Sequence, residues 1–500
     1  MDEISFVDTT LRDGHQSLWA EGMLTGMILP IAERMDQAGF EAIELVAPSF
    51  FKKACREFKE DIWERIRLVR QRVANTPLRA IRNRYMTGFQ VTPALVTQLW
   101  LERLAANGIR ELRSSDPSNT AANWAEMVRS ANEVGIATII NLTFSESPKH
   151  SDAYYAERAR QAAALRPARI CIKDPGALLT PDRTRTLVPT VLAAVGAVPV
   201  EFHTHCITGL GPMCCYEAIK LGIRSINTAI PPLANGSSNP SLFTVARNAR
   251  ALGYRTAVDE AVLQPVAGHF NIIAKREGFA PGEPREYDSY HYHHQVPGGM
   301  ISNFRFQLGK LGMAHRIGEV LEEVARVRRE LGYPIMVTPY SQFVGVQAAM
   351  NIILGARYQE CTDEVIQYAL GAWGEDESSA IEANVKDRIL DRPRARELKQ
   401  DQAPELTLQQ LRVKLAGAGV SDDELLLRYF AGKEDVERMK GAAPVRPYLS
   451  GQQPLVLLIQ ELSKKKNLGQ VVVRRGELTI RLERQGERPT LRSGSAARVG

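Results

Sequence analysis

Eight short apolar segments, rich in β-branched residues, alternate with helical stretches along the first half of the chain. The segments span residues 4–8, 42–46, 78–81, 111–114, 137–142, 170–173, 198–203 and 225–229. The pieces between them, such as 94–107 and 154–165, show the apolar spacing of amphipathic helices. Eight such units in roughly 250 residues predict an α/β fold, a (β/α)8 or TIM barrel. An open doubly wound sheet is the alternative, and the absence of a G-x-G-x-x-G motif after the first segment weakens it.

The 500-residue chain changes character after about residue 300, where only helical patterns follow (316–331, 341–354, 362–372, 406–415 and 422–430). We therefore expect a barrel over residues 1–300 and an all-α region over 301–440. A Pro/Gly-rich joint then precedes a helix and two alternating strands. These predict a small C-terminal helix–hairpin module over 455–485, and residues 486–500 are expected to form a disordered tail.

The net charge of +6 is unevenly distributed. The last 37 residues contain ten Lys/Arg and three Asp/Glu, so the rest of the chain is close to neutral. No nucleic-acid partner is expected, because such a partner needs phosphate-neutralising charge on the folded body. Six scattered cysteines form no C-x-x-C pair, and no run of 18 apolar residues predicts a membrane span. With no signal-sequence pattern at the N-terminus, the expected location is cytoplasmic.

Unusual polar residues follow the predicted strands, at the barrel end where functional side chains gather. His203 and His205 alternate along a strand, so both imidazoles point the same way and suit a divalent metal. Asp13 and Lys173 should converge on the same point from the first and sixth strands. The residues alone leave three roles open for Lys173: an amine with a lowered pKa, an ion-pair partner of Asp174, or a CO2-derived carbamate that binds metal.

Several motifs together resemble the biotin-dependent carboxyltransferase family. Residues 8–17, D-T-T-L-R-D-G-H-Q-S, resemble its opening motif, and residues 172–181, I-K-D-P-G-A-L-L-T-P, its carbamyl-lysine segment. Residues 202–205, F-H-T-H, resemble its metal-binding strand, while H-Q-V-P-G-G (294–299) and V-T-P-Y-S-Q (337–342) extend the likeness into the helical region. The family contains the carboxyltransferase domain of pyruvate carboxylase, the α subunit of oxaloacetate decarboxylase and the keto-acid subunit of transcarboxylase.

The resemblance, which covers about residues 3–440, implies a role for each matching residue. The metal, Zn, Mn or Co, would be bound by Asp13, carbamylated Lys173, His203 and His205. The implied catalytic residues are Arg12, Gln16, Arg82 and Ser237. Among these, Arg82 would bind the carboxylate of a 2-oxo acid and Ser237 would replace a proton-relaying threonine. The implied reaction moves a carboxyl group between carboxybiotin and pyruvate, oxaloacetate or a related 2-oxo acid through a metal-stabilised enolate.

Four positions of the substrate shell depart from the family pattern. Lys52 stands at the position of an aspartate, Phe89 at that of a tyrosine, and Asn227 at that of another aspartate. Arg84 lies in R-N-R-Y, where the family has Arg-Gly-Gln-Asn. Lys52 and Arg84 would add positive charge suited to a more anionic substrate such as a dicarboxylate, unless both side chains point into solvent.

The sequence contains no Ala-Met-Lys-Met biotinylation motif, so biotin is expected on a separate carrier protein, with a biotin carboxylase subunit as a further partner. The helix–hairpin module weakly resembles the N-terminal segment of biotin carboxyl carrier proteins, which suggests a docking role. The alternative is a solvated basic appendage. A homodimer or larger assembly is implied by resemblance alone. Two other functions compete: a non-catalytic assembly or regulatory paralogue that retains the metal site, and a biotin-independent aldol-type lyase.

Overall fold

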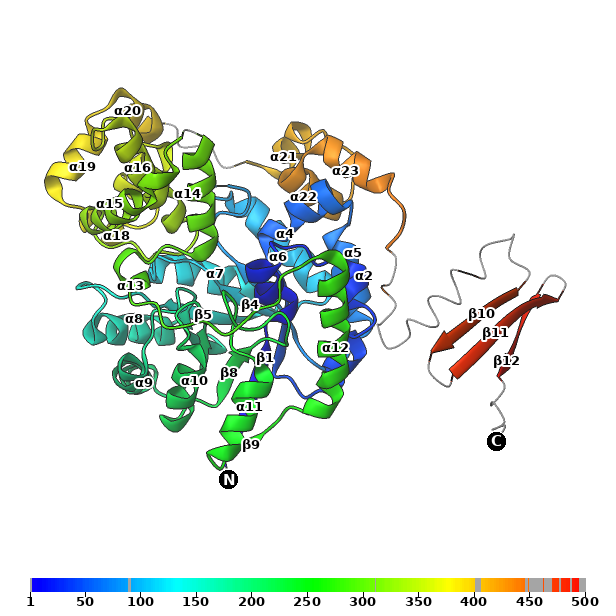
Figure 1. Ribbon diagram of the computed structural model, residues 1–500. Coiled ribbons are helices and arrows are strands. Elements are labelled where there is room, and N and C mark those ends of the chain that lie inside the picture. The colour runs from blue at the N-terminus through cyan, green and yellow to red at the C-terminus, as the bar shows by residue number, and fades with distance from the viewer. Residues whose placement is uncertain are drawn as a thin grey trace.

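Eight parallel strands close into a barrel in the computed structural model (Figure 1). The structure describes residues 2–88, 91–310, 312–400, 406–445, 448, 462, 470–475, 478–485 and 488–493. Neighbouring strands pair in chain order, and β1 pairs with both β8 and β2, which closes the barrel. The strands are β1 (Glu3–Asp8), β2 (Ala42–Val46), β3 (Leu78–Arg82), β4 (Glu111–Ser114), β5 (Ala137–Thr143), β6 (Arg169–Asp174), β7 (Val200–Thr204) and β8 (Ser225–Thr228), with a short β9 (Arg255–Thr256) beside β1. The predicted (β/α)8 fold is confirmed.

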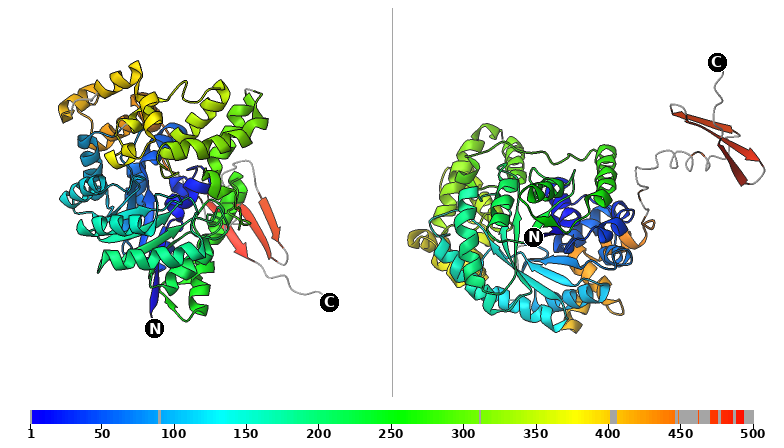
Figure 2. Two further views of the ribbon diagram at one scale, coloured as in Figure 1. Left: turned by 90° about the vertical axis from the view of Figure 1, so that its left-hand side faces the viewer. Right: turned by 90° about the horizontal axis from the view of Figure 1, so that it is seen from below.

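Helices surround the barrel on its outer face (Figures 1 and 2). They are α1 (His15–Leu18), α2 (Thr25–Ile28), α3 (Ala32–Gln37), α4 (Pro48–Lys53), α5 (Ile62–Arg70), α6 (Ala94–Asn107), α7 (Ala121–Glu133), α8 (Asp152–Ala164), α9 (Pro181–Val195), α10 (Gly211–Lys220), α11 (Leu242–Ala251) and α12 (Glu260–Glu277). Two π-helical turns, η1 (Thr10–Gly14) and η2 (Ala54–Phe58), follow β1 and α4.

Local signals set several of these helix starts. Ser151 accepts a hydrogen bond from the backbone of Tyr154 at the start of α8. Thr180 does the same for Arg183 at the start of α9, where Pro181 is the first helical residue. Side-chain oxygens at these positions satisfy backbone N–H groups that have no partner within the helix, and proline there loses no hydrogen bond. Each helix therefore begins close to the end of its strand and keeps the strand ends in register.

The helices after residue 300 gather in two places on the rim where the strands end (Figures 1 and 2). One group has its own apolar core, which contains Tyr340, Tyr368 and Trp373. It comprises α13 (His291–His294), α14 (Gly298–Lys310), η3 (Ala314–Arg316), α15 (Ile317–Glu330), α16 (Tyr340–Leu354), α17 (Asp363–Ala369), α18 (Glu375–Ser379), α19 (Ala383–Leu390) and α20 (Pro393–Gln400). The sequence predicts α15, α16 and α17 of this group, but neither its other helices nor the division into two groups.

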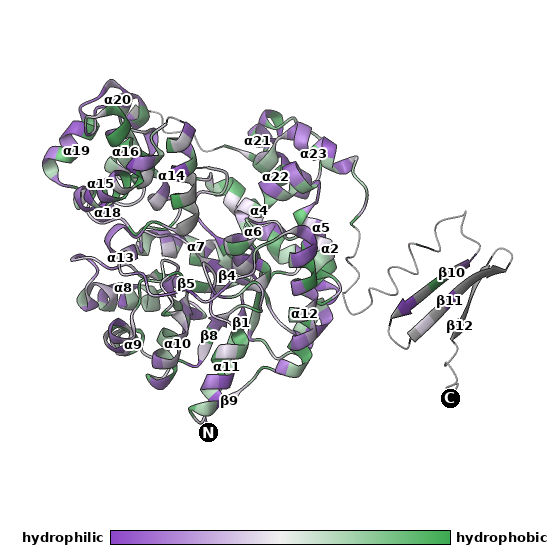
Figure 3. Ribbon diagram, viewed as in Figure 1, coloured by the Kyte–Doolittle hydropathy of each residue, from purple (hydrophilic) through white to green (hydrophobic). Residues whose placement is uncertain are grey.

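The second group packs on the barrel and shares its apolar core. It comprises α21 (Leu408–Lys414), α22 (Asp422–Ala431) and α23 (Lys433–Lys440). Phe430 of α22 stacks on Phe51 with ring centroids 4.8 Å apart, and the Trp63 indole donates to the carbonyl of Asp423 at 3.1 Å. Many of the surrounding helices alternate between hydrophilic and hydrophobic residues, as expected for helices with one buried face (Figure 3).

The C-terminal module contains three antiparallel strands rather than two. They are β10 (Gln470–Arg475), β11 (Leu478–Gln485) and β12 (Arg488–Ser493). The predicted disordered tail is therefore wrong over residues 488–493, because Leu491 pairs with Leu482 of β11 and continues the sheet. Apart from Leu462, the helix predicted over 455–466 lies outside the described residues. Among the described helices, none combines the length and apolar character needed to cross a bilayer.

Candidate metal centre and substrate site

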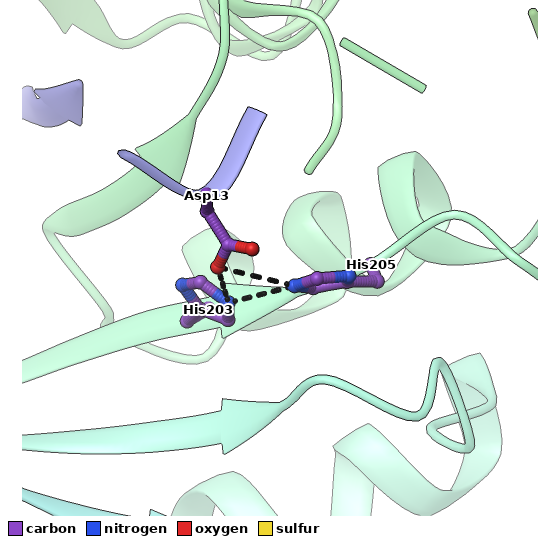
Figure 4. Close-up of side chains that lie close together, drawn as sticks. All are labelled: Asp13, His203 and His205. Carbon is purple, nitrogen blue, oxygen red and sulfur yellow. Dashed lines mark hydrogen bonds and ion pairs between the residues drawn. The ribbon is translucent and has the colours of Figure 1, made fainter. Parts of the chain in front are cut away.

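Three potential metal ligands meet at the carboxyl end of the barrel (Figure 4). Asp13 lies in η1, His203 at the end of β7, and His205 directly after that strand. The Asp13 Oδ2 atom lies 3.3 Å from the Nε2 atom of each histidine, and the two Nε2 atoms are 3.1 Å apart. All three side chains are buried. Three of the four residues that the sequence predicts as ligands are thus brought to one point.

The Nδ1 nitrogen of each imidazole forms a hydrogen bond that orients the ring. His205 Nδ1 donates to the carbonyl of Ser237 at 2.7 Å, and His203 Nδ1 donates to Asn227 Oδ1 at 3.0 Å. The Asn239 amide lies 3.2 Å from His203 Nε2 and donates to it. These contacts leave both Nε2 atoms as acceptors facing Asp13. Such backing by a carbonyl or amide oxygen is typical of metal-binding histidines.

Charge and burial at the centre also suit a cation. Burial alone would raise the pKa of Asp13, but the positive charge of the adjacent Arg12 guanidinium holds it well below its usual range. Burial lowers the pKa of His203 to about 3, with a further contribution from Arg113. An ionised carboxylate and neutral imidazoles are the forms that bind divalent metals. The donor set of this centre therefore fits a divalent metal.

Lys173 lies beside this cluster in the barrel wall. It ends β6, in register with His203 on β7, and its Nζ atom lies 3.4 Å from Ser115 Oγ. Burial lowers the pKa of this amine to about 7, and the positive charges of Arg113 and Arg12 act in the same direction. A large fraction of the amine is therefore neutral near pH 7, which is the form that can react with CO2.

A layer of charged side chains lies beneath the centre. Glu44 on β2 pairs with Arg12 at 2.6 Å and with Arg113 at 2.8 Å. Arg79 pairs with Glu201 at 2.9 Å across the barrel. Burial would raise the pKa of Glu44, but Arg113, Arg12 and Arg79 outweigh it and lower it to about 2. Sequence patterns did not single out Glu44, Arg79 and Glu201, although a charged residue inside each apolar strand was an available signal.

Arg12, Gln16 and Ser237 surround the cluster. Arg12 lies 2.8 Å from Asp13 Oδ2 and donates to Gln16 Oε1 at 3.3 Å. The Ser237 hydroxyl donates to the carbonyl of Ser17 at 2.8 Å. Because the Ser237 carbonyl also accepts from His205, this serine is tied directly to the predicted metal ligands.

Arg82 ends β3 beside the same region. Its backbone carbonyl accepts from Ser115, the residue whose hydroxyl lies near Lys173. Its guanidinium donates to Glu126 at 2.8 Å, while its buried Nε has no partner among the described residues. Arg84, two residues on, is half-buried.

The other three residues predicted for the substrate shell differ in their positions. Lys52 is exposed on α4. Asn227 lies fully buried on β8, where it bonds to Arg113 and backs His203. Phe89 lies outside the described residues.

Comparisons with known proteins agree with this geometry. Residues 3–268 match the HMGL-like family model, and residues 292–440 match the conserved carboxylase domain. A pyruvate carboxylase subunit from Methanocaldococcus jannaschii is 34% identical over 391 residues, which cover 78% of this chain and 68% of that protein. The 2-oxoglutarate carboxylase large subunit of Hydrogenobacter thermophilus is 32% identical over 390 residues, or 78% of this chain and 60% of that protein.

The fold is also that of a solved structure. The carboxyl transferase domain of Rhizobium etli pyruvate carboxylase superposes with a TM-score of 0.80 at 22% identity, covering 97% of this chain and 84% of that one. This chain spans only about two thirds of the length of the two sequence relatives above. The two family models nevertheless match the barrel and the helices that follow it. The chain therefore belongs to the biotin-dependent carboxyltransferase family, which includes the carboxyltransferase parts of pyruvate carboxylases.

Proposed function

We propose that this chain is the carboxyltransferase subunit of a multi-subunit enzyme that moves a carboxyl group between protein-borne biotin and a 2-oxo acid. The observation that carries the proposal is the buried cluster of Asp13, His203 and His205, with both Nε2 atoms presented to one carboxylate oxygen. The Ser237 hydroxyl and the Arg12 guanidinium lie beside this cluster, because Ser237 bonds to His205 through its carbonyl and Arg12 pairs with Asp13. These are the groups that enolate chemistry on a 2-oxo acid requires.

The roles of the protein groups follow from their contacts. When bound, a divalent metal would polarise the keto oxygen, and biotin would bring or remove the carboxyl group. Arg82 would bind the substrate carboxylate, because a guanidinium can hold a carboxylate through two parallel hydrogen bonds. Arg12 would position Gln16 through a hydrogen bond. Its positive charge would also stabilise the negative charge that develops on the keto oxygen. Ser237, anchored by its carbonyl to His205, would hold the proton that leaves the carbon next to the keto group.

We further propose that Lys173 becomes a fourth metal ligand as a CO2-derived carbamate. Its lowered pKa and its position in register with His203 support this role. Carbamylation would also replace a buried positive charge with a negative one. The change would relieve the repulsion between Lys173 and its cationic neighbours Arg113 and Arg12.

The partners are a carrier protein that bears biotin and a biotin carboxylase subunit, with a homodimer or larger assembly of this chain. The relatives named as subunits support this arrangement. We propose that the barrel occupies residues 1–300, the helical region 301–440, and a carrier-docking module 455–485. A cytoplasmic location is proposed because all six cysteines are unpaired in the structure.

The test uses the chain purified with its partners, loaded with Mn2+ and bicarbonate. We expect biotin-dependent decarboxylation of oxaloacetate that falls at least 100-fold in Ser237→Ala and Lys173→Ala. Metal content should fall in Lys173→Ala only. Lys149→Ala is the matched control, because Lys149 is a partly buried lysine that pairs with Glu377 on α18, away from the cluster.

Two outcomes would contradict the proposal. Full metal occupancy without turnover of any 2-oxo acid would favour a non-catalytic paralogue. Cleavage of a 2-oxo acid that proceeds equally well without biotin would favour an aldol-type lyase. Unchanged metal content in Lys173→Ala would contradict the carbamate alone.

A further inference from the structure

The guanidinium of Arg84 has no carboxylate partner among the described residues. It forms no hydrogen bond or ion pair with any residue in the described part of the chain, and its Nε is shielded from solvent. The side chain is half-buried, so water compensates it only in part. A cation withdrawn from water without a counter-charge is unfavourable, and such groups are expected to meet an anion. Arg84 therefore has an unused capacity for an anionic ligand.

Asp116, an acidic residue that also acts on Tyr85, is engaged elsewhere. Asp116 and Arg84 both act on the pKa of Tyr85, in opposite directions, so both lie near its ring. Asp116 nevertheless accepts from the backbone of Ser118 at 2.9 Å and from the Asn123 amide at 2.7 Å. These contacts hold the carboxylate within its own loop. Asp116 is thus not the partner that Arg84 lacks.

The backbone at Arg84 is firmly held. The next residue, Tyr85, inserts into the core of the helical region, where it stacks on Trp373 with centroids 3.6 Å apart and an interplanar angle of 22°. On the other side, Thr92 donates from its backbone to the Arg84 carbonyl at 2.8 Å and accepts from the Met86 amide at 3.0 Å. These contacts, including the stack on the helical region, therefore fix the position of the Arg84 backbone.

That place adjoins the substrate site. Arg84 follows Arg82 by two residues, and the Arg82 carbonyl is bonded to Ser115 beside Lys173. Of these two arginines, only Arg82 has a carboxylate partner among the described residues, the part-exposed Glu126. Lys52, the other added cation, is exposed on α4, where water and salt screen its charge. Two residues beyond the end of β3, Arg84 thus adds a second guanidinium close in the chain to Arg82, and this one lacks a carboxylate partner among the described residues.

We infer that Arg84 is a specificity-determining residue that selects a 2-oxo dicarboxylate, such as 2-oxoglutarate, over 2-oxo acids with one carboxylate. Arg82 binds the carboxylate next to the keto group, and Arg84 binds the distal one. Tyr85 is a positioning residue that acts through Arg84 by its stack on Trp373. This inference rests on the proposed function and narrows its substrate class.

The test compares 2-oxoglutarate with 2-oxopentanoate, which has the same carbon chain but no distal carboxylate. Their affinities for the Mn2+-loaded chain are measured by calorimetry. Biotin-dependent exchange of their C3 protons with deuterated solvent is followed by NMR. We expect the wild-type chain to favour 2-oxoglutarate by at least tenfold in both measurements, the range of one charge-assisted hydrogen bond.

Variants distinguish a loss of substrate preference from a loss of folded protein. Arg84→Gln should raise the KM and Kd for 2-oxoglutarate at least tenfold and leave both constants for 2-oxopentanoate unchanged. Tyr85→Ala should lose the same preference, and Tyr85→Phe, which keeps the stacked ring, should retain it. Arg129→Gln is the control, because Arg129 is an exposed arginine on α7.

Each failure has its own signature. Equal constants for the two compounds in the wild-type chain, or a preference that survives in Arg84→Gln, would overturn the role of Arg84 while the proposed function stands. Binding and exchange of neither compound, nor of pyruvate, would overturn both.

Discussion

Glu44→Gln tests whether the charged layer beneath the metal centre stabilises the barrel. Glu44 is fully buried and is the carboxylate shared by Arg12 and Arg113. The substitution keeps the shape of the side chain and removes only its charge. Two guanidinium groups are then left in the barrel interior without their common counter-ion. We expect a less stable protein, since breaking a buried pair from one side leaves an uncompensated charge.

The expected size follows from the pKa of Glu44, which falls from 4.5 to about 2 in the folded protein. A downward shift means that folding favours the ionised form, so its contribution is complete well above pH 4.5 and is lost as the pH falls towards 2. At about 1.4 kcal/mol per pKa unit, the carboxylate contributes about 3 kcal/mol at pH 7. By the same linkage relation, about 2 kcal/mol remains at pH 3.5.

The assay is urea unfolding of the metal-free protein, followed by tryptophan fluorescence and circular dichroism at pH 7 and pH 3.5. Free energies of unfolding for Glu44→Gln and wild type are compared at each pH, so that the titration of other groups cancels. Glu33→Gln is the control, because Glu33 is exposed on α3. A difference below about 1 kcal/mol at pH 7, the size expected of a surface pair, would refute the argument. A difference that does not shrink at pH 3.5 would refute its electrostatic origin.

Two further substitutions test the site and the packing. Asn227→Leu should weaken metal binding by about 10- to 100-fold, because His203 loses the acceptor for its Nδ1 proton, while Asn227→Asp should retain binding. Competition with a metal indicator measures this, and equal affinity in Asn227→Leu would contradict the orienting role. Phe430→Ala should lower the free energy of unfolding by about 3–5 kcal/mol, because the Phe430 ring stacks on Phe51 in the core. The same substitution should make α22 more susceptible to proteolysis. Val413→Ala, at a position that is 75% exposed, should change neither.

The candidate metal centre could be predicted because its signals are local. His203 and His205 alternate along one strand, and the strand period of two places their side chains on the same face. Asp13 and Lys173 follow from the rule that the carboxyl ends of barrel strands meet on one rim. Neither inference needs knowledge of which distant residues touch.

The surroundings of the centre could not be predicted in the same way. Asn227 departs from the family pattern, and only the folded structure brings it into contact with Arg113 and His203. Glu44, Arg79 and Glu201 lie on three strands far apart in sequence. Their pairing depends on the closure of the barrel, so each looks like an isolated charge in its own strand.

Local patterns along the chain were enough to predict the alternation of strands and helices, the barrel that follows from it, and the cluster of Asp13, His203 and His205 as candidate metal ligands. Apolar periodicity and turn chemistry are properties of neighbouring residues, which is why they are visible before folding is considered. The folded chain alone establishes which helices cap the barrel, which carboxylate compensates which arginine, and that Arg84 has none among the described residues. Those outcomes depend on contacts between residues tens to hundreds of positions apart, where burial makes a missing partner costly and a present one stabilising.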